Sequence, residues 1–539
     1  MTPSVPVTIP SLRVKPIKTP AFVLRRVVIE GSTIYGPAAL RPLYRRYIGQ
    51  RVNGATVARI AEALTVKYRN GGYILSHAVV RSINLRTGVV RIEALQGYIE
   101  KVQLDPLVYE VGKQGGILKK ILRKIVRICH DGDHPVDGRP CPLNRAELER
   151  YLLLANDLPG VTATAVIAPS PHETGAADLF VTIHEKHFEI SGTLDNRGTD
   201  YLGPLEAHET AALNDILGLY DRTEFDLAES IPISHLYLAR VSEQIPLTSE
   251  GLRLALAYTH ARAHPGNILG PLNLTDTTDS GDIILSYPWL RTRSQNLMLH
   301  ADFNIQNSIA SLSHSTLYDD RTRALELGGT YDLADRWFGV NLAEFSLTQG
   351  LPVFDPTARD SDTSSHQYAP PDFTKLNLEL SRLQQLVPQW NLLAAVKGQY
   401  AFEPLLTPEQ FGYGGEQYGR AYDNSEFLGD NGVAAKLELQ FTPSWGPGLF
   451  GWSQGVTALQ FYAFTDGGRV WLNPTSTEPG QPPHETGSSV GGGIRFSIAN
   501  RFSGYIEVAE PLTSPVLART DDGKNGWLPR VFFAISARY

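Results

Sequence analysis

The sequence contains almost no cysteine, with two cysteines among 539 residues, which excludes a small secreted module built on disulfides. It has no excess of basic residues: 49 Lys and Arg stand against 56 Asp and Glu, a net charge of −7. A general nucleic-acid binder needs a basic surface, so we expect no nucleic-acid partner. No run of about 18 apolar residues occurs, which argues against a membrane-spanning helix and leaves strand-built membrane proteins open.

The sequence also lacks a recognisable leader. Residues 1–20 contain five prolines and no apolar core of the kind that a secretory signal has, so we expect a proline-rich linker there. A removed signal, a misassigned start and an absence of export are the three alternatives.

No catalytic set stands out. The three glycines at 491–493 precede a strand rather than a helix, so they do not form a phosphate loop. The scattered His and Asp residues lack nucleophile-elbow or metal-ligand spacing. We therefore predict no enzyme activity, no cofactor and no metal site.

Two stretches, residues 21–97 and 98–187, share one plan. In each, apolar periodicity predicts a strand, two helices and two closing strands. The first stretch places one helix at residues 39–50 and a second from residue 54 to a glycine C-cap at Gly71 and Gly72. In the second helix, one face carries Val57, Ile60, Ala61, Leu64 and Tyr68. Two α+β modules in tandem are typical of a modular arm rather than an enzyme core.

Residues 188–539 read as many strands of alternating polarity. One example places Val433, Leu437 and Leu439 on one face and Lys436 and Glu438 on the other. A soluble β-sandwich or propeller shows similar alternation. Three features favour a membrane barrel: a spacing that allows strands of about 10 residues with turns and longer loops, charged side chains in mid-strand, and the chain's ending. Length alone allows 14, 16 or 18 strands.

The last ten residues, RVFFAISARY, alternate with an aromatic end, so that Val531, Phe533, Ile535, Ala537 and Tyr539 share one face. This pattern resembles the C-terminal strand by which bacterial outer-membrane barrels are recognised for assembly. We therefore expect Tyr539 to act as an assembly signal and the barrel assembly machinery to be a partner.

A glycine-rich loop with a central Arg420 runs into the strand that ends at Phe441. In the next strand, Phe464 and Asp466 lie on the face that also carries Gln460. An arginine brought inside a barrel leaves bulk water and needs a carboxylate, which its planar fork suits. We therefore expect Arg420 to pair with Asp466.

Three short motifs occur in an order that resembles a known family: Gly71-Gly72-Tyr73, residues 156–160 (NDLPG), and Asp195-Asn196-Arg197-Gly198. Together they resemble two polypeptide-transport-associated (POTRA) repeats that lead into the barrel of a two-partner secretion transporter of the ShlB/FhaC/HecB-like family, a form of type V secretion. The resemblance covers roughly residues 21–539. It implies a linker (1–20), POTRA 1 (21–97), POTRA 2 (98–187) and a barrel of 16 antiparallel strands (188–539), with an inward-folded loop (403–432).

The same resemblance assigns the central loop. Members of the family carry a Val-Arg-Gly-Phe/Tyr motif at the tip of the inward loop and a Phe-x-Asp motif on the lumen wall. Here these read Gly419-Arg420-Ala421-Tyr422 and Phe464-Thr465-Asp466. Alanine tolerates a positive φ poorly, so Ala421 in place of glycine puts the family's loop backbone in question. We expect the loop to act as a gate or scaffold of the conduction path; the alternatives are a purely stabilising pair and a solvated Arg420.

In an oxidising periplasm, Cys129 and Cys141 are expected to form a disulfide. The alternative is a metal site that includes His130 and His134, but the spacing lacks the C-x2-C knuckle of zinc sites.

The resemblance implies an outer-membrane translocator with its repeats in the periplasm. The partners that it implies are outer-membrane lipid and a secreted exoprotein with an N-terminal secretion domain, of the adhesin, haemolysin or contact-dependent toxin type. A barrel-assembly factor of the same superfamily and a passive porin are the alternatives.

Overall fold

The structure is a computed structural model that describes residues 19–104, 116–126, 141–172, 175–231, 233–313, 315–443, 456–474, 482–499 and 501–539. The chain divides into two compact units, Met1–Lys186 and His187–Tyr539. In the described part of the chain, no helix is long and apolar enough to cross a membrane. Most of residues 1–20 and Cys129 lie outside the described residues.

The first unit begins with a three-stranded sheet in the order β2 (Arg26–Glu30), β5 (Val89–Leu95), β4 (His77–Asn84), packed against helix α2 (Gly54–Asn70). The predicted face of α2 is confirmed, because Val57, Ile60, Ala61, Leu64 and Tyr68 are all buried. The side-chain oxygen of Asn53 accepts from the Thr56 N–H and so caps the helix.

The predicted helix at residues 39–50 is wrong. The structure has a single turn, α1 (Pro37–Leu40), and then two 3-10 turns, η1 (Arg41–Leu43) and η2 (Arg45–Tyr47). Pro42 has no N–H to donate and its ring crowds the preceding turn, which explains why an α-helix does not continue. The segment returns as β3 (Arg51–Val52), which pairs with β1 (Phe22–Val23).

The second module follows the predicted order of strand, helix, helix, strand, strand. It comprises β6 (Tyr98–Leu104), α3 (Ile117–Val126), α4 (Arg145–Asn156), β7 (Val161–Pro169) and β8 (Ala176–Glu185). The sheet order is β6-β8-β7, so that the central strand β8 is parallel to β6 and antiparallel to β7.

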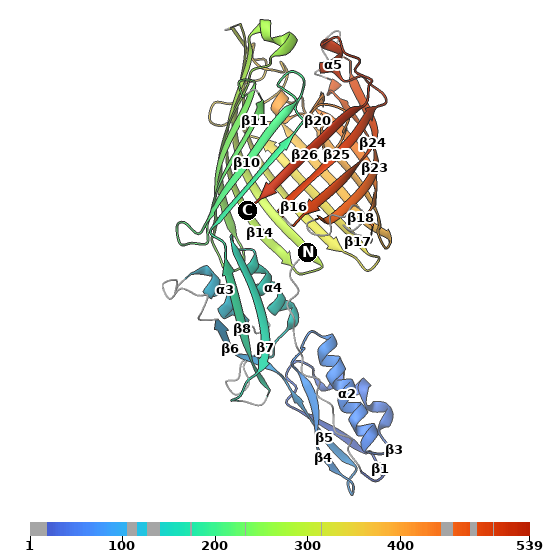
Figure 1. The fold of residues 1–539 in the computed structure, drawn as a ribbon. Helices are drawn as coiled ribbons and strands as arrows, with labels where there is room; N and C mark the ends of the chain where they lie inside the picture. Colours follow the sequence, from blue (N-terminus) through green and yellow to red (C-terminus); the bar gives the residue numbers. More distant parts are fainter. Residues whose placement is uncertain are drawn as a thin grey trace. The chain divides into compact units, whose positions relative to one another are not determined.

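The second unit is a closed antiparallel barrel of 16 strands, as predicted (Figure 1). Strand β9 (Phe188–Asp195) closes it against β26 (Arg530–Arg538). The strands between them are β10 (Leu205–Asn214), β11 (Arg222–Ile231), β12 (Leu236–Pro246), β13 (Arg253–Ala263), β14 (Leu274–Arg291), β15 (Gln295–Leu312), β16 (Ser315–Ala334), β17 (Gly339–Gly350), β18 (Thr374–Val387), β19 (Trp390–Ala401), β22 (Asn431–Phe441), β23 (Val456–Trp471), β24 (His484–Ile498) and β25 (Phe502–Pro511).

The alternating sequence pattern produces two different barrel faces. On β22 the outward Val433, Leu437 and Leu439 are exposed, whereas Glu438 and Gln440 are buried in the interior. The apolar positions thus form an outer surface suited to lipid, and the polar positions form the lumen wall.

The segment between β19 and β22 folds into the lumen and carries η5 (Thr407–Glu409) and a small hairpin, β20 (Phe411–Tyr413) with β21 (Phe427–Gly429). We call this segment, residues 402–430, the inward loop. In the described part of the barrel, two other connections contain short helices, η4 (Asn267–Leu272) and α5 (Leu517–Asp521).

Candidate functional site: the anchor of the inward loop

The inward loop is held at its base by one carboxylate and along its length by aromatic rings. Asp430 is fully buried and accepts from the backbone N–H groups of Leu405 (2.9 Å) and Asn473 (2.7 Å). Tyr413, Tyr422 and Phe427 form a cluster with ring centroids 5.0–6.1 Å apart. The loop is therefore a packed element rather than a solvated excursion.

The lumen wall is shaped to receive these rings. A Cβ added to Gly468 would lie 2.2 Å from the Tyr413 ring, and one added to Gly487 would lie 2.6 Å from it. The glycines at 491 and 493 do the same for the rings of Phe464 and Tyr462. These glycines, which do not form a phosphate loop, make room for aromatic side chains.

The departures from the family motif are explained by the loop backbone. Gly419 has φ +79°, while Ala421 is not among the residues with positive φ. The left-handed position thus falls on residue 419, where this chain has glycine, and Ala421 needs no glycine. Ala421 is fully buried in a cluster with Tyr462, Phe464 and Phe532, so the methyl group fills space at the loop tip.

The guanidinium of Arg420 binds two glutamates on the lumen wall. Its Nη2 lies 2.7 Å from Glu438 of β22, and its Nη1 lies 3.2 Å from Glu507 of β25. The arginine side chain is 5% exposed, and the two glutamates are 1% and 2% exposed. The guanidinium carbon also lies 4.2 Å from the centre of the Phe464 ring, a cation–π contact.

Asp466 contacts the loop tip, as predicted, but it binds the backbone of Arg420 and not the expected guanidinium. Its Oδ2 accepts from the backbone N–H of Arg420 (3.3 Å), and its Oδ1 accepts from the hydroxyls of Tyr413 (3.2 Å) and Ser489 (2.5 Å). The expected ion pair between Arg420 and Asp466 is therefore wrong. Asp466 binds the backbone of the loop tip, and Glu438 and Glu507 bind the guanidinium of Arg420. Three donors on Asp466 leave the arginine fork free to reach across to β22 and β25.

Two further arginines hold consecutive carbonyl oxygens of the loop tip. Arg197 donates to the carbonyl of Arg420 (3.0 Å), and Arg530 donates to the carbonyl of Ala421 (3.0 Å). Arg530 also lies 2.7 Å from the carboxylate of Asp423 in the loop. The hydroxyl of Tyr422 lies 3.1 Å from the carbonyl of Ser488 on the wall. The tip is thus fixed by its backbone as well as by its side chains.

The alternation of polar and apolar residues along β22 could have identified Glu438, a site residue that we did not predict. Glu438 lies on the recognised polar face of β22, and a mid-strand carboxylate on a lumen face is a natural partner for a loop arginine. Glu438 also binds Arg495 (2.6 Å). The guanidinium of Arg495 stacks on Tyr462, with its carbon 3.7 Å from the ring centre. For Glu507 we find no sequence signal beyond the same alternation.

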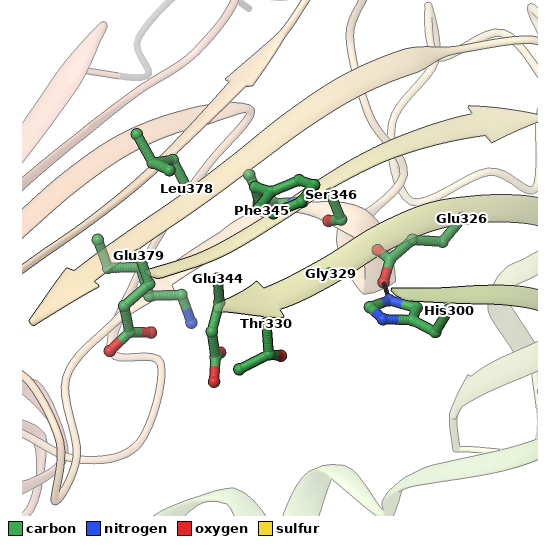
Figure 2. A pocket seen from close by; sticks show the side chains of 11 residues that line it. His300, Glu326, Gly329, Thr330, Glu344, Phe345, Ser346, Leu378 and Glu379 are labelled. Carbon is green, nitrogen blue, oxygen red and sulfur yellow. Dashed lines mark hydrogen bonds and ion pairs between the residues drawn. The ribbon is translucent and has the colours of Figure 1, made fainter. Parts of the chain in front are cut away.

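The wall across β15–β19 contains a cavity of ≈ 260 Å³. Figure 2 shows Thr330, Glu344 and Glu379 beside one another, and these three are register partners on neighbouring strands. Tyr418 of the inward loop donates to Glu379 (2.9 Å) and so reaches the edge of this cavity. Polar and charged side chains of this kind favour contact with water, as in an aqueous lumen, over burial in an apolar core.

One group in the described part of the barrel has donor atoms close enough to hold a metal ion: Asp195, Glu206 and His208. His208 lies 3.5 Å from Asp195 and 3.8 Å from Glu206, distances typical of ion pairs.

The other predicted residues fall as follows. Phe464 is buried against the Arg420 guanidinium, and Tyr422 is buried in the aromatic cluster. Tyr539 is 72% exposed at the end of β26, and its role in assembly stays a prediction. Cys141 is buried, and because Cys129 lies outside the described residues, the disulfide also stays a prediction.

Replacing Gly419 with valine, the residue usual in the family motif, is expected to destabilise the loop tip. A Cβ there would lie 2.9 Å from the Gly414 Cα, and the positive φ adds strain of about 1–3 kcal/mol. We expect a lower unfolding temperature in heat-modifiability gels of the purified barrel. Ala421→Gly is the matched control, with a smaller expected effect; an unchanged unfolding temperature in Gly419→Val would contradict the assigned backbone.

Comparison with known proteins shows which family has this architecture. Residues 179–494 match the family described as haemolysin secretion/activation protein ShlB/FhaC/HecB, and residues 22–97 match the ShlB-type POTRA domain. The heme/hemopexin transporter protein HuxB of Haemophilus influenzae (strain 86-028NP) is 23% identical over 88% of this chain and 81% of its own length. The outer membrane transporter CdiB of Dickeya dadantii (strain 3937) is 23% identical over 94% of this chain and 85% of its own.

A solved structure shows the same fold. CdiB from Escherichia coli aligns with a TM-score of 0.75 and 19% identity, over 99% of this chain and 94% of that one. The family match covers more than half of the present sequence and includes most of the barrel. The chain therefore belongs to the ShlB/FhaC/HecB family of two-partner secretion transporters, with a 16-stranded barrel in the outer membrane and POTRA domains in the periplasm.

Proposed function

We propose that this transporter recognises one unfolded partner exoprotein through its POTRA repeats and secretes it through the barrel without nucleotide hydrolysis. The observation that carries the proposal is the lumen: a polar passage occupied by a loop whose tip is held by ion pairs and hydrogen bonds. An exoprotein can pass through this barrel only if the inward loop moves out of its path. The ion pairs and hydrogen bonds that anchor the loop tip can be replaced by hydrogen bonds to water.

Recognition is proposed to occur at the open edge of the second module's sheet. In the described part of the chain, β7 has one strand neighbour, β8. At the other edge of β7, the side chain of Asn156 accepts from the Ala163 N–H and donates to the Ala163 carbonyl, both at 2.9 Å. These two bonds imitate those of a neighbouring strand.

Backbone groups alternate in direction along a strand, so Ala165 and Ile167 direct their N–H and C=O groups to the same side as Ala163. An extended passenger segment can continue there the pattern that Asn156 begins, through backbone hydrogen bonds that need little side-chain specificity. This supports β7 as the docking strand for an unfolded chain.

The energy for net movement is proposed to come from folding of the exoprotein outside the cell, because the sequence has no nucleotide-binding motif. The partner is proposed to be a large exoprotein of the adhesin, haemolysin or contact-dependent toxin type, with an N-terminal secretion domain. The relatives are described as heme/hemopexin and outer-membrane transporters, and these descriptions do not choose among the three types.

The test is co-expression with the exoprotein encoded beside the gene, comparing the intact transporter with a version that lacks residues 22–186. We expect exoprotein in the medium only with the intact chain, since the deletion removes the docking strand and leaves the barrel. Heat-modifiability of the truncated barrel in outer-membrane fractions is the control for its assembly.

Two outcomes would redirect the proposal. If the exoprotein stayed inside in both strains and other outer-membrane barrels were lost on depletion, the chain would be an assembly factor. If a deletion strain lost only the uptake of small solutes, it would be a passive channel.

A further inference from the structure

The motif Asp195-Asn196-Arg197 lies at the end of β9, the strand that closes the barrel, and the anchor described so far uses only part of it. The closing strands β9 and β26 share five register pairs, whereas β9 shares eight with β10 and β26 shares eight with β25. We call the contact between β9 and β26 the seam. It is the shorter ladder for both strands.

Asn196 lengthens the seam beyond its last register pair. Its Nδ2 donates to the Val531 carbonyl (2.9 Å), and its Oδ1 accepts from the Phe533 N–H (2.7 Å). Asp195 fixes the turn that follows, because its Oδ1 accepts from the Arg197 N–H (2.8 Å). Asn196 and Asp195 thus place Arg197 at the end of the seam where β9 ends.

Arg197 then reaches three separate elements. Its Nη2 lies 2.5 Å from Glu507 of β25, its Nη1 donates to the carbonyl of Arg420 in the inward loop (3.0 Å), and its guanidinium carbon lies 3.9 Å from the ring centre of Phe532 on β26. The side chain is 11% exposed. A single, largely buried guanidinium therefore connects both sides of the seam to the tip of the loop.

We infer that Arg197 is a positioning residue that couples the inward loop to the seam, so that the seated loop and the closed seam stabilise each other. Movement of the loop tip removes the carbonyl that Arg197 binds, and separation of β9 from β26 carries Arg197 away from that carbonyl and from Phe532. Because such a coupling is reciprocal, either event makes the other easier. The inference rests on the proposed function only in requiring that the loop can leave its seat.

The experiment measures loop release with the seam locked or free, without secretion. Thr193 and Ser536 are register partners with hydroxyl oxygens 2.8 Å apart, so Thr193→Cys with Ser536→Cys provides a reversible disulfide lock. Ala421→Cys places a thiol that is fully buried while the loop is seated. In full-length protein in liposomes, with Cys129→Ser and Cys141→Ser, a maleimide reports loop release at position 421. The locked protein is oxidised before labelling, and the open comparison keeps Thr193 and Ser536, so that the thiol at position 421 is the one that reacts.

With Arg197 present, we expect the lock to slow labelling at position 421 by about fivefold or more. Arg197→Ala is expected to label faster and at one rate with the lock open or closed, and Arg197→Lys to regain part of the dependence. Arg495→Ala is the matched control: it weakens the Glu438 side of the anchor but touches no seam residue, so labelling should speed up and still respond to the lock.

If the lock slowed labelling equally in Arg197→Ala and in the parent, Arg197 would not couple the two elements, and the inference would fail. Equal labelling rates in all variants would show that Arg197 has only a packing role. Either result is independent of whether an exoprotein is secreted, so failure of the coupling and failure of the proposed function are told apart.

Discussion

Arg420→Ala is expected to free the tip of the inward loop and to reduce the secreted exoprotein to background. The substitution removes the charge that Glu438 and Glu507 share, and both carboxylates are at most 2% exposed. Breaking a buried ion pair by removing one partner costs about 3–5 kcal/mol. The measurements are exoprotein in the medium and protease sensitivity of the loop in intact cells.

Arg382→Ala is the control at a separate ion pair of the barrel, because that arginine on β18 pairs with Asp335 at 2.7 Å and is 36% exposed, away from the loop. We expect near-normal secretion from it, since an ion pair whose arginine stays in contact with water contributes little. The exchange Arg420→Asp with Asp466→Arg is expected not to restore secretion, because Asp466 binds the backbone of the tip. Rescue by this exchange would contradict the assigned ion pairs.

Glu507→Gln is expected to be nearly as damaging. One carboxylate accepts from Arg197, Arg420 and the hydroxyl of Tyr462, so its neutral isostere leaves two buried guanidinium groups short of counter-charge. We expect a loss of about 3 kcal/mol or more in the stability of the seated loop. Thermal unfolding of the purified barrel and secretion should both show it.

Glu379→Gln provides the comparison for Glu507. Glu379 lies on the open wall, is half-buried and accepts from the hydroxyl of Tyr418. A neutral amide can still accept that bond, so we expect a change of about 1 kcal/mol or less. Equal effects of the two substitutions would mean that the charge network does not hold the loop.

Local patterns in the sequence predicted the elements well where the period was clear. The face of α2 and the alternation along β22 follow from one helix or one strand, and burial of one side is the reason for each pattern. The segment at residues 39–50 failed because apolar spacing outweighed Pro42 in the prediction. Inside a helix, proline lacks the N–H for the bond to the preceding turn and its ring clashes there, whatever the spacing of its neighbours.

The candidate site was predicted in position but not in chemistry. Arg420 and Asp466 do meet, yet the ion pair runs to Glu438 and Glu507, which are 18 and 87 residues away from Arg420 in the sequence. Many mid-strand carboxylates have the same alternation, so the pattern alone does not show which of them faces the loop tip. That choice depends on the register of β22, β23 and β25 and on where the loop turns.

The sequence by itself determined the two α+β modules and the alternating strands, because each depends on local spacing or residue type, whereas the inward position of Arg420 was expected from the resemblance to the family. Only the tertiary structure decided closure into 16 strands, the positive φ at Gly419, the two glutamates on Arg420 and the bridge from Arg197 to the seam. These features join residues from distant strands, and their contacts exist only once the ladder is in register and the inward loop is seated against the wall.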